Sequence, residues 1–339
     1  MAAGTSLSNQ MVAQPGSLPK IGQIGTGHAH AKGKMAGLRS LKDTWDVVGV
    51  VSAEIPADEP AYAGLPVLTE TALLENKDVK AVAVEVKMED AVATAVRCLR
   101  AGKHIHLDKP GALLHGEYKS MRLESEKLGL TVQMGYMLRY NPAFELLYQA
   151  VREGWLGEIT EIDAAMGKLA DAKTRKNLAA LPGGGMFELA CHVIDSVVYL
   201  LGKPSSVFAS STPTINDGMK DNQLAVLQYP KATATIRCNH TDPFGTIHRR
   251  FNVIGTKGSF EISPLESGKV NLTLSTPLGE YKKGLQAIAL PMPKGRYDNE
   301  FIDLSKVVRG EKKLAWNADH DIAVHETVMR AAGIAIPAE

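Results

Sequence analysis

Apolar and polar positions follow two different patterns along the chain, and the first half shows the pattern of strands joined by helices. Short apolar runs predict buried strands at residues 20–24, 47–52, 81–86, 104–107 and 131–135. Stretches of helical periodicity separate them, for example over residues 31–41 and 117–127. Strands that alternate with helices form parallel sheets, because each helix returns the chain to the same edge. The first half therefore predicts a doubly wound parallel sheet.

The second half shows helices before and after a series of strands. Helical periodicity covers residues 142–154, 185–201, 299–308 and 321–333. Between residues 159 and 275, several runs alternate apolar and polar residues and are separated by turn residues, which is typical of an antiparallel sheet. The predicted fold class is therefore α/β, with an N-terminal doubly wound parallel sheet and a C-terminal α/β domain built on a large, mostly antiparallel open sheet.

Length and composition agree with two folded domains. A chain of 339 residues exceeds what one compact core usually serves, and 45% hydrophobic with 22% charged residues is the balance of a folded protein. We place the domain boundary near Leu138. This gives a flexible arm at residues 1–19, a first domain at 20–138 and a second domain at 139–339.

The charges and cysteines argue against several classes of function. Basic residues number 38 and acidic residues 37, so neither a nucleic-acid footprint nor a polybasic membrane patch is expected. Cys98, Cys191 and Cys238 form no C-x-x-C pair, which argues against a disulfide framework and a structural zinc site. No apolar run reaches the ~20 residues of a membrane span, and residues 1–19 lack the features of a signal peptide. We expect a cytoplasmic protein and leave open an exported form with a trimmed signal.

A glycine turn follows the first predicted strand. Gly25-Thr26-Gly27 stands between that strand and the next helix, where glycines allow a tight turn and let backbone N–H groups approach a pyrophosphate. His28 follows directly, and His30 occupies the place of the third glycine in the usual motif. The alternative is a plain strand–helix turn. The βαβ context favours a dinucleotide site.

The segment after the second predicted strand favours NAD over NADP. The acidic residue that binds the ribose hydroxyls is expected about 20 positions after the glycines, but Asp46 precedes the strand and so lies at the wrong end of the sheet. Ser52 is at the tip of the strand instead. No Lys or Arg occurs between Ser52 and Leu73, whereas acidic residues stand at Glu54, Asp58 and Glu59. A 2′-phosphate would meet no cation there.

Three ionisable side chains are candidates for catalysis. Lys109 follows a strand of the first half, at the edge of the sheet where ligands bind. Glu188 and His192 are four residues apart on one face of a predicted helix, and a histidine can exchange a proton near neutral pH. Asp195 is expected either to orient the ring of His192 or to belong to a buried network. Taken singly, Lys109 is more often a solvated lysine and His192 a core residue.

Four motifs together resemble the Gfo/Idh/MocA family, which is named after glucose–fructose oxidoreductase and inositol dehydrogenase. They are Gly25-Thr26-Gly27-His28, Asp108-Lys109-Pro110, Arg139-Tyr140-Asn141-Pro142 and the run from Gly183 to Asp195. The resemblance extends over essentially the whole chain from Lys20. It implies a Rossmann domain that binds NAD or NADP. An α/β domain would follow that binds the substrate and makes oligomer contacts, so we expect a homodimer or homotetramer.

The resemblance also implies roles for individual residues. Lys109, His192 and Glu188 form the implied catalytic set, with Glu188 in place of the family's aspartate. The expected cofactor-binding residues are Gly25, Thr26, Gly27, His28, Ser52, Glu85, Asp108 and Lys109. The expected substrate-binding residues are Arg139, Tyr140, Asn141, Glu188 and His192.

Two departures from the family pattern lie near the expected cofactor. Asp108 stands where the family has a glutamate, which keeps the charge type. Val86-Lys87-Met88 stands where the family has T-P-N. This change makes Glu85 a candidate neighbour of the cofactor or the substrate.

The implied activity is hydride transfer between NAD and a hydroxyl of a sugar, glycoside or cyclitol, and three other interpretations stay open. Some relatives use tightly held NAD transiently, to cleave glycosides through a 3-keto intermediate without net redox. A non-catalytic NAD-bound sensor is the second. His104 and His106 resemble the metal pair of amidohydrolase barrels, but the second half does not show the βα units of a barrel. His325-Glu326 begins a zinc motif in which Met329 replaces the second histidine. No metal site is predicted.

Overall fold

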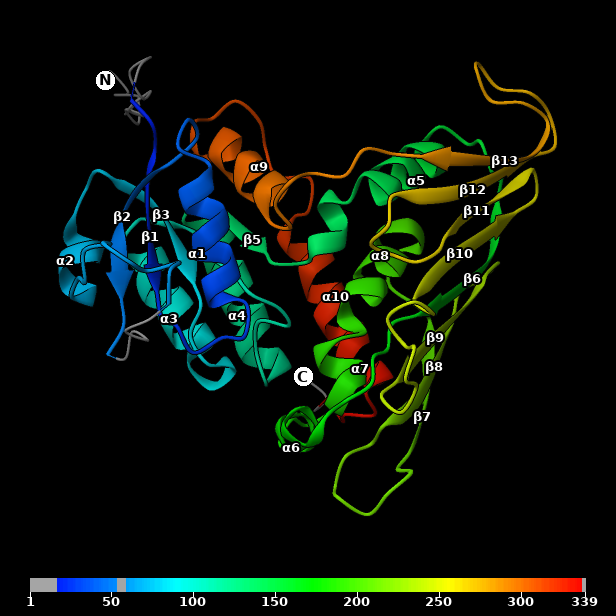
Figure 1. Ribbon diagram of the computed structural model, residues 1–339, viewed down its shortest axis with the longest axis horizontal. Coiled ribbons are helices and arrows are strands. Elements are labelled where there is room, and N and C mark those ends of the chain that lie inside the picture. Colours follow the sequence, from blue (N-terminus) through cyan, green and yellow to red (C-terminus); the bar gives the residue numbers. More distant parts are fainter. Residues whose placement is uncertain (1–16, 54–58, 337–339) are drawn as a thin grey trace, which may run out of the picture.

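The computed structural model describes residues 17–53 and 59–336 and contains two sheets with helices between them (Figure 1). The first sheet has five parallel strands in the order β2-β1-β3-β4-β5. The second has eight strands in the order β13-β12-β11-β10-β6-β9-β8-β7, and only its β6–β9 pair is parallel. The predicted fold class is confirmed. Most of the arm expected at residues 1–19 lies outside the described residues.

The first sheet positions the site through its strand order. Its strands are β1 (Lys20–Ile24), β2 (Asp46–Val51), β3 (Val79–Val84), β4 (His104–Leu107) and β5 (Val132–Met134). The helices that join them are α1 (Ala31–Ser40), α2 (Glu70–Glu75), α3 (Met88–Arg100) and α4 (His115–Lys127). From β1 the chain goes outward to β2 and then crosses back to β3, so the strand order reverses between β1 and β3, which is where ligands bind in sheets of this kind.

The second sheet buries one set of alternate side chains. Its strands are β6 (Ile159–Ala165), β7 (Ser206–Thr212), β8 (Asn222–Gln228), β9 (Thr233–Asn239), β10 (Arg250–Gly255), β11 (Gly258–Ile262), β12 (Lys269–Leu274) and β13 (Gly284–Ala289). Helices α5 (Pro142–Arg152) and α8 (Cys191–Leu201) pack against it on the side of the first domain (Figure 1). Phe208 and Leu285 of this sheet are exposed. The homodimer or homotetramer stays a prediction.

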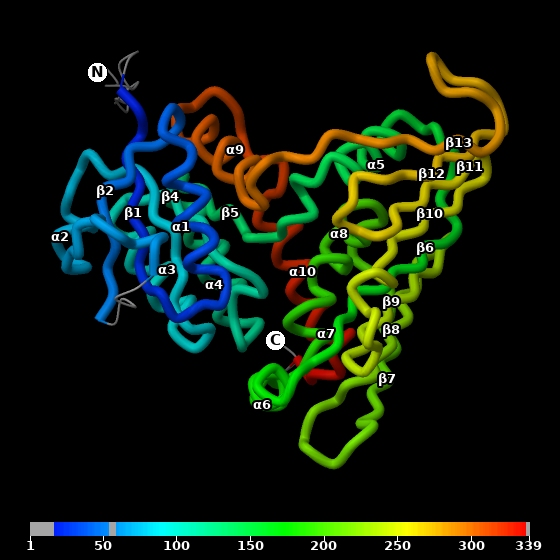
Figure 2. Tube along the Cα trace, viewed as in Figure 1, coloured from blue at the N-terminus to red at the C-terminus, as the bar shows by residue number. Residues whose placement is uncertain are grey.

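The chain returns to the first domain near its end. In α9 (Asp298–Val308), Phe301 and Leu304 pack against residues of β1 and β3, and the indole N–H of Trp45 donates to Phe301 O at 2.9 Å. Figure 2 shows α9, in orange, beside the blue segments of the first sheet. Helix α10 (Ala318–Ala331) then packs against α4 and α8. The division into two consecutive domains does not describe this return.

The helix predicted at residues 185–201 is two helices, which corrects the sequence-based expectation. Both Leu189 N and Ala190 N donate to Gly185 O, at 2.8 and 3.0 Å, and this bend separates α7 (Gly184–Glu188) from α8. The remaining helical elements are η1 (Met137–Tyr140) and α6 (Ala172–Ala179). None of the helices in the described part of the chain combines the length and the apolar character that a membrane span requires.

Candidate active site

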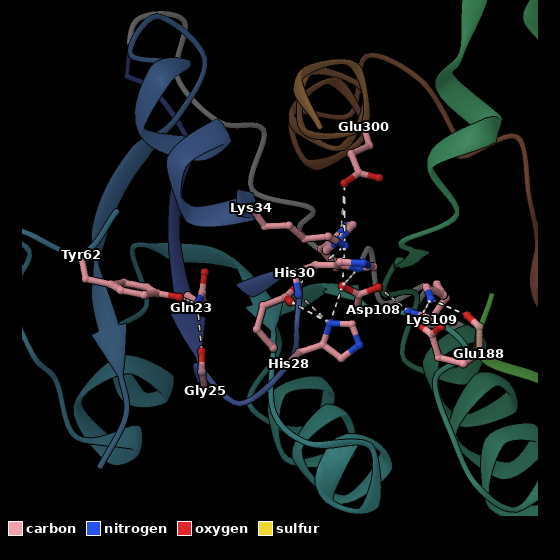
Figure 3. Close-up of polar contacts among 12 residues, drawn as sticks. Gln23, Gly25, His28, His30, Lys34, Tyr62, Asp108, Lys109, Glu188 and Glu300 are labelled. Carbon is pink, nitrogen blue, oxygen red and sulfur yellow. Dashed lines mark hydrogen bonds and ion pairs between the residues drawn. The ribbon is translucent and has the colours of Figure 1, made fainter. Parts of the chain in front are cut away.

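A group of ionisable side chains, most of them buried, lies at the carboxyl edge of the first sheet (Figure 3). His28 follows β1, Glu85 follows β3 and Asp108 follows β4, so the edge itself brings them together. The other members come from the residue before α1, from α1 itself, and from β4 and α9. We call this group the acidic cluster; it consists of His28, His30, Lys34, Glu85, His106, Asp108 and Glu300.

Asp108 contacts three members of the acidic cluster through a single carboxylate oxygen. Its Oδ2 lies 2.9 Å from His28 Nδ1, 3.0 Å from His30 Nδ1 and 3.2 Å from Lys34 Nζ. Its Oδ1 accepts a hydrogen bond from Lys109 N at 2.7 Å. Burial opposes the charge of Asp108, but Lys34 and the two histidines outweigh it and hold its pKa well below the ordinary value. Asp108 is therefore ionised at neutral pH.

The acidic cluster contains more carboxyl groups than ammonium groups. The Lys34 ammonium is fully buried, contacts His106 Nε2, and lies 3.7 Å from Glu85 Oε1 and 3.8 Å from Glu300 Oε1. Among the described residues, none donates a hydrogen bond to either oxygen of Glu85 or of Glu300. Burial raises the pKa of Glu85 well above its ordinary value and raises that of Glu300 to about 7. Three carboxyl groups thus face one lysine.

Lys109 and Glu188 form an ion pair between the two domains. Lys109 Nζ donates to Glu188 Oε1 at 2.7 Å and to the carbonyl oxygen of the same residue at 2.5 Å. Burial opposes both charges, but each partner outweighs it. As a result the pKa of Lys109 lies above its ordinary value and that of Glu188 falls to about 2. Lys109 is therefore a cation held at a fixed place.

The bend between α7 and α8 makes this arrangement possible. In a continuous helix, His192 N would donate to Glu188 O; instead it donates to Leu189 O at 3.5 Å. The carbonyl oxygen of Glu188 is thereby available to Lys109. The predicted relation between Glu188 and His192 on one helix face does not occur, because the two residues belong to different helices.

His192 lies in the first turn of α8 and is 2% exposed. Its Nδ1 is buried and has no hydrogen-bond partner among the described residues. Burial, and then the charge of Lys109, lower the pKa of His192 well below its ordinary value. Its imidazole is therefore neutral near pH 7 and has a nitrogen available for a proton or a hydrogen bond.

The glycine turn closes against the segment after β3. Gly25 has φ +88°, its N–H donates to Val51 O at 2.7 Å, and a Cβ there would lie 2.6 Å from Val86 Cγ1. Thr26 Oγ1 and Ser52 Oγ are 2.8 Å apart, so Ser52 reaches the turn. A glycine is required here on both conformational and steric grounds.

The structure also places the other residues discussed for the nucleotide site. Lys87 lies beside the turn, since a Cβ on Gly27 would be 3.1 Å from Lys87 Cγ. No role was predicted for this lysine. Asp46 pairs with Lys20 at the amino end of the sheet, as expected. Glu54 and Asp58 lie outside the described residues.

The three residues expected to bind substrate at the domain junction are used by the protein itself. Arg139 donates to both carboxylate oxygens of Asp195, at 2.7 and 3.0 Å, and to Asp321 Oδ1 at 2.6 Å. Tyr140 accepts from Gln133 and donates to Asp303, and Asn141 accepts from Ala143 N as the N-cap of α5. All three are buried. The structure does not bring them to Lys109 and His192 as free polar groups.

Asp195 belongs to a buried network and does not orient His192. Arg122 Nη2 lies 2.8 Å from Asp321 Oδ2, which extends the network of Arg139. We call this group the arginine cluster; it consists of Arg122, Arg139, Asp195 and Asp321.

Sequence reasoning missed Lys34 and Glu300, although a signal was present. Lys34 lies on the buried stripe of α1 with Ala31, Met35 and Leu38. Glu300 likewise precedes Phe301 on the buried face of α9. An ionisable residue on the apolar stripe of a helix needs a buried partner, and that pattern could have marked both residues.

Comparison with known proteins shows relatives among NAD-binding oxidoreductases. The family model "Oxidoreductase family, NAD-binding Rossmann fold" matches residues 20–136, and the model "GFO/IDH/MocA C-terminal domain" matches residues 144–261. The uncharacterised oxidoreductase YhhX of Escherichia coli is 25% identical over 262 residues, which are 76% of this chain and 75% of that protein. Myo-inositol 2-dehydrogenase of Thermotoga maritima is 24% identical over 59% of this chain and 61% of its own length.

Solved structures share the fold over nearly the whole chain. Levoglucosan dehydrogenase, solved in complex with NADH and L-sorbose, has a TM-score of 0.80 at 18% identity and covers 94% of this chain and 97% of its own. At this identity the likeness concerns the fold.

Proposed function

Since this chain belongs to the Gfo/Idh/MocA family of NAD-binding oxidoreductases, we propose that it transfers a hydride between NAD and a hydroxyl-bearing carbon of a sugar, glycoside or cyclitol. The proposal rests on the arrangement of Lys109, Glu188 and His192. The Lys109–Glu188 ion pair fixes a cation at the carboxyl edge of the first sheet, and the neutral His192 has an unpartnered buried nitrogen. Related dehydrogenases act on polyols, as the name of the myo-inositol enzyme states.

The residues of the first domain fit a dinucleotide. The glycine turn with Gly25 at φ +88° precedes the N-terminus of α1, where backbone N–H groups favour a pyrophosphate. Lys87 adds a positive charge beside the turn. A bound nicotinamide supplies the hydride acceptor or donor. We propose NAD rather than NADP, because the 2′-phosphate of NADP needs a cationic partner. No Lys or Arg occurs between Ser52 and Leu73, and Lys32, on α1, is already paired with Glu59 at 3.3 Å.

The protein's own groups handle the proton of the reacting hydroxyl. In the oxidative direction, Lys109 Nζ donates a hydrogen bond to the hydroxyl oxygen and stabilises the negative charge that develops there. The neutral imidazole of His192 accepts the hydroxyl proton. Glu188 keeps Lys109 charged and in place, because its carboxylate and carbonyl oxygens both accept from Nζ.

The cofactor and the substrate class can be tested together. Mass spectrometry of nucleotide released from the purified protein identifies the dinucleotide, and absorbance of reduced nicotinamide is followed while sugars, glycosides and inositols are added. Growth of that absorbance with NAD and one of these polyols is the expected result. Consumption of a glycoside without accumulation of free NADH would favour the transient-redox interpretation. A protein that binds neither dinucleotide would overturn the proposal.

The role of His192 has its own test. We expect His192→Asn to lower kcat by about 10²–10⁴-fold, while NADH binding, measured by fluorescence titration, stays close to that of the unchanged protein. His248→Asn is the matched control, because His248 is an exposed histidine paired with Asp242. An unchanged kcat together with a lower melting temperature would make His192 a core residue only.

A further inference from the structure

We propose that His28, His30, Asp108 and Glu85 form a binding site for one divalent transition-metal cation, beside the glycine turn. The donor atoms of His28, His30 and Asp108 all lie within 4.8 Å of one another. Figure 3 shows the two imidazoles and the Asp108 carboxylate pointing toward one another. The proposal concerns metal binding alone and does not depend on the proposed reaction, but His28, Glu85 and Asp108 are also expected to contact the cofactor, so the cation would share this pocket with the dinucleotide.

The spacing of the donor atoms suits a small cation. Zinc binds nitrogen and oxygen donors at about 2.0–2.2 Å, which places the ligand atoms of a tetrahedral site about 3.3 Å apart. Asp108 Oδ2 lies 2.9 Å from His28 Nδ1 and 3.0 Å from His30 Nδ1, and His28 Nδ1 lies 3.7 Å from Glu85 Oε2. The two imidazoles and Asp108 therefore lie close enough to serve as three ligands of one cation, and Glu85, beside His28, is a fourth donor that must move further to reach it.

Glu85 supplies an independent reason for a cation. Its side chain is fully buried, and neither of its oxygens accepts a hydrogen bond from a described residue. A buried carboxyl group without a donor is costly. Coordination of Oε2 to a cation shared with His28 removes that cost. The 3.7 Å ion-pair distance between Lys34 and Glu85 Oε1 leaves Oε2 on the side of the histidines.

The acidic cluster offers carboxyl groups beyond Asp108, namely Glu85 and Glu300, around the single ammonium of Lys34. Lys34 contacts Glu300 as well as Asp108, so it keeps a partner when Asp108 binds the cation.

The types of ligand indicate which metal binds, and the exposure of their side chains indicates the side from which it enters. Two imidazoles and two carboxylates favour zinc, iron, cobalt or manganese over magnesium and calcium, which prefer all-oxygen sites. The side chains of His28 and His30 are 14% and 27% exposed, whereas those of Glu85 and Asp108 are 0% and 4% exposed. The cation therefore enters from the histidine side. There it lies next to Lys109, whose backbone N–H binds the same Asp108.

This site could not be predicted from a local sequence pattern, because its donors come from three segments that are far apart in the chain. His28 and His30 are two residues apart, Glu85 follows β3 and Asp108 follows β4. None of these spacings corresponds to a known short metal motif.

The test uses the full chain freed of metal with a chelator. Titration with Zn²⁺ by calorimetry, and with Co²⁺ by visible absorption, is expected to show one ion per chain and the spectrum of a four-coordinate site. His30→Asn should weaken Zn²⁺ binding by at least about tenfold, since even changes outside the ligand set cost 10–100-fold. His248→Asn, the exposed control, should leave the affinity unchanged.

Affinity should also fall as the pH is lowered, because each Nδ1 must offer a lone pair in place of a proton. Melting curves in the absence of metal show whether the variants are folded. If His30→Asn does not fold, Asp108→Asn and Glu85→Gln take its place. Absence of a 1:1 site in the unchanged protein overturns the proposal. Equal Zn²⁺ affinity of the unchanged protein and of a folded ligand variant overturns it too.

Discussion

The acidic cluster and the arginine cluster are both buried, but they differ in how their charges are paired. The arginine cluster has two guanidinium groups and two carboxylates, joined by contacts of 2.6–3.0 Å. The acidic cluster has three carboxyl groups and one ammonium. Two of those carboxyl groups lie 3.7 and 3.8 Å from Lys34, beyond hydrogen-bond distance.

The difference follows from where each group lies. The arginine cluster joins α4, η1, α8 and α10, so it connects the first domain to the second, and each charge has its opposite close by. The acidic cluster lies at the sheet edge, with its histidines partly exposed. Buried charges persist when they are paired or hold a cation. We therefore expect the cluster whose charges are all paired to have a structural role, and the cluster with unpaired carboxyl groups at the sheet edge to hold a ligand.

Removal of the central arginine tests the structural half of this comparison and has the largest expected effect. Arg139→Met leaves Asp195 and Asp321 buried without their main partner, and breaking a buried ion pair in this way costs about 3–5 kcal/mol. The free energy of unfolding in urea measures it. Arg97→Met, at an exposed ion pair with Glu70, is the control and should cost no more than about 1 kcal/mol. A similar loss in both variants would show that pairing in the arginine cluster contributes little.

Removal of the Glu300 carboxyl group from the acidic cluster should increase the free energy of unfolding above neutral pH, whereas removal of Arg139 lowers it. Burial raises the pKa of Glu300 to about 7, so the folded protein keeps a proton that the unfolded chain releases near pH 4.5. The contribution of Glu300 to the free energy of unfolding is fully present below pH 4.5 and is lost as the pH rises to 7. Glu300→Gln should therefore be more stable than the unchanged protein at pH 8, by about 1–3 kcal/mol, with little difference at pH 4.5.

Urea unfolding at the two pH values measures this difference. Glu117→Gln, at an exposed position on α4, serves as the control and should leave the pH profile unchanged. Parallel profiles for Glu300→Gln and the unchanged protein would mean that Glu300 is ionised in the fold, as a bound cation or a closer Lys34 would allow.

Local pattern predicted the fold well and the two clusters only in part. The strands of the first sheet lie within two residues of their predicted bounds, because buried parallel strands are continuous apolar runs. The placement of Lys109 after β4 followed from the same pattern. Its bond to Glu188 depends on the bend at Leu189 and Ala190, which a continuous helical period conceals. The catalytic roles of both residues stay predictions.

Contacts between distant segments account for what was missed. Lys34 and Glu300 meet only because α9 returns to the first sheet, 266 residues after α1 supplies the lysine. Arg139 was expected to face substrate because it lies at the domain junction. In the fold, α8 and α10 place Asp195 and Asp321 against its guanidinium group and bury it. The apolar stripes mark Lys34 and Glu300 as buried, but no period or spacing in the sequence indicates which partners these side chains or Arg139 meet.

His320, at the partly exposed side of the arginine cluster, should have the smallest effect on the free energy of unfolding. His320 Nε2 lies 3.0 Å from Asp195 Oδ1, but its side chain is 14% exposed, so water can replace the hydrogen bond. Asp195 also keeps both bonds from Arg139. His320→Ala should therefore cost only about 0.5–1.5 kcal/mol in urea unfolding, and His320→Gln, which retains an N–H donor, should recover part of it. A loss as large as that of Arg139→Met would show that His320 shares in the charge balance and that the cluster extends to the surface.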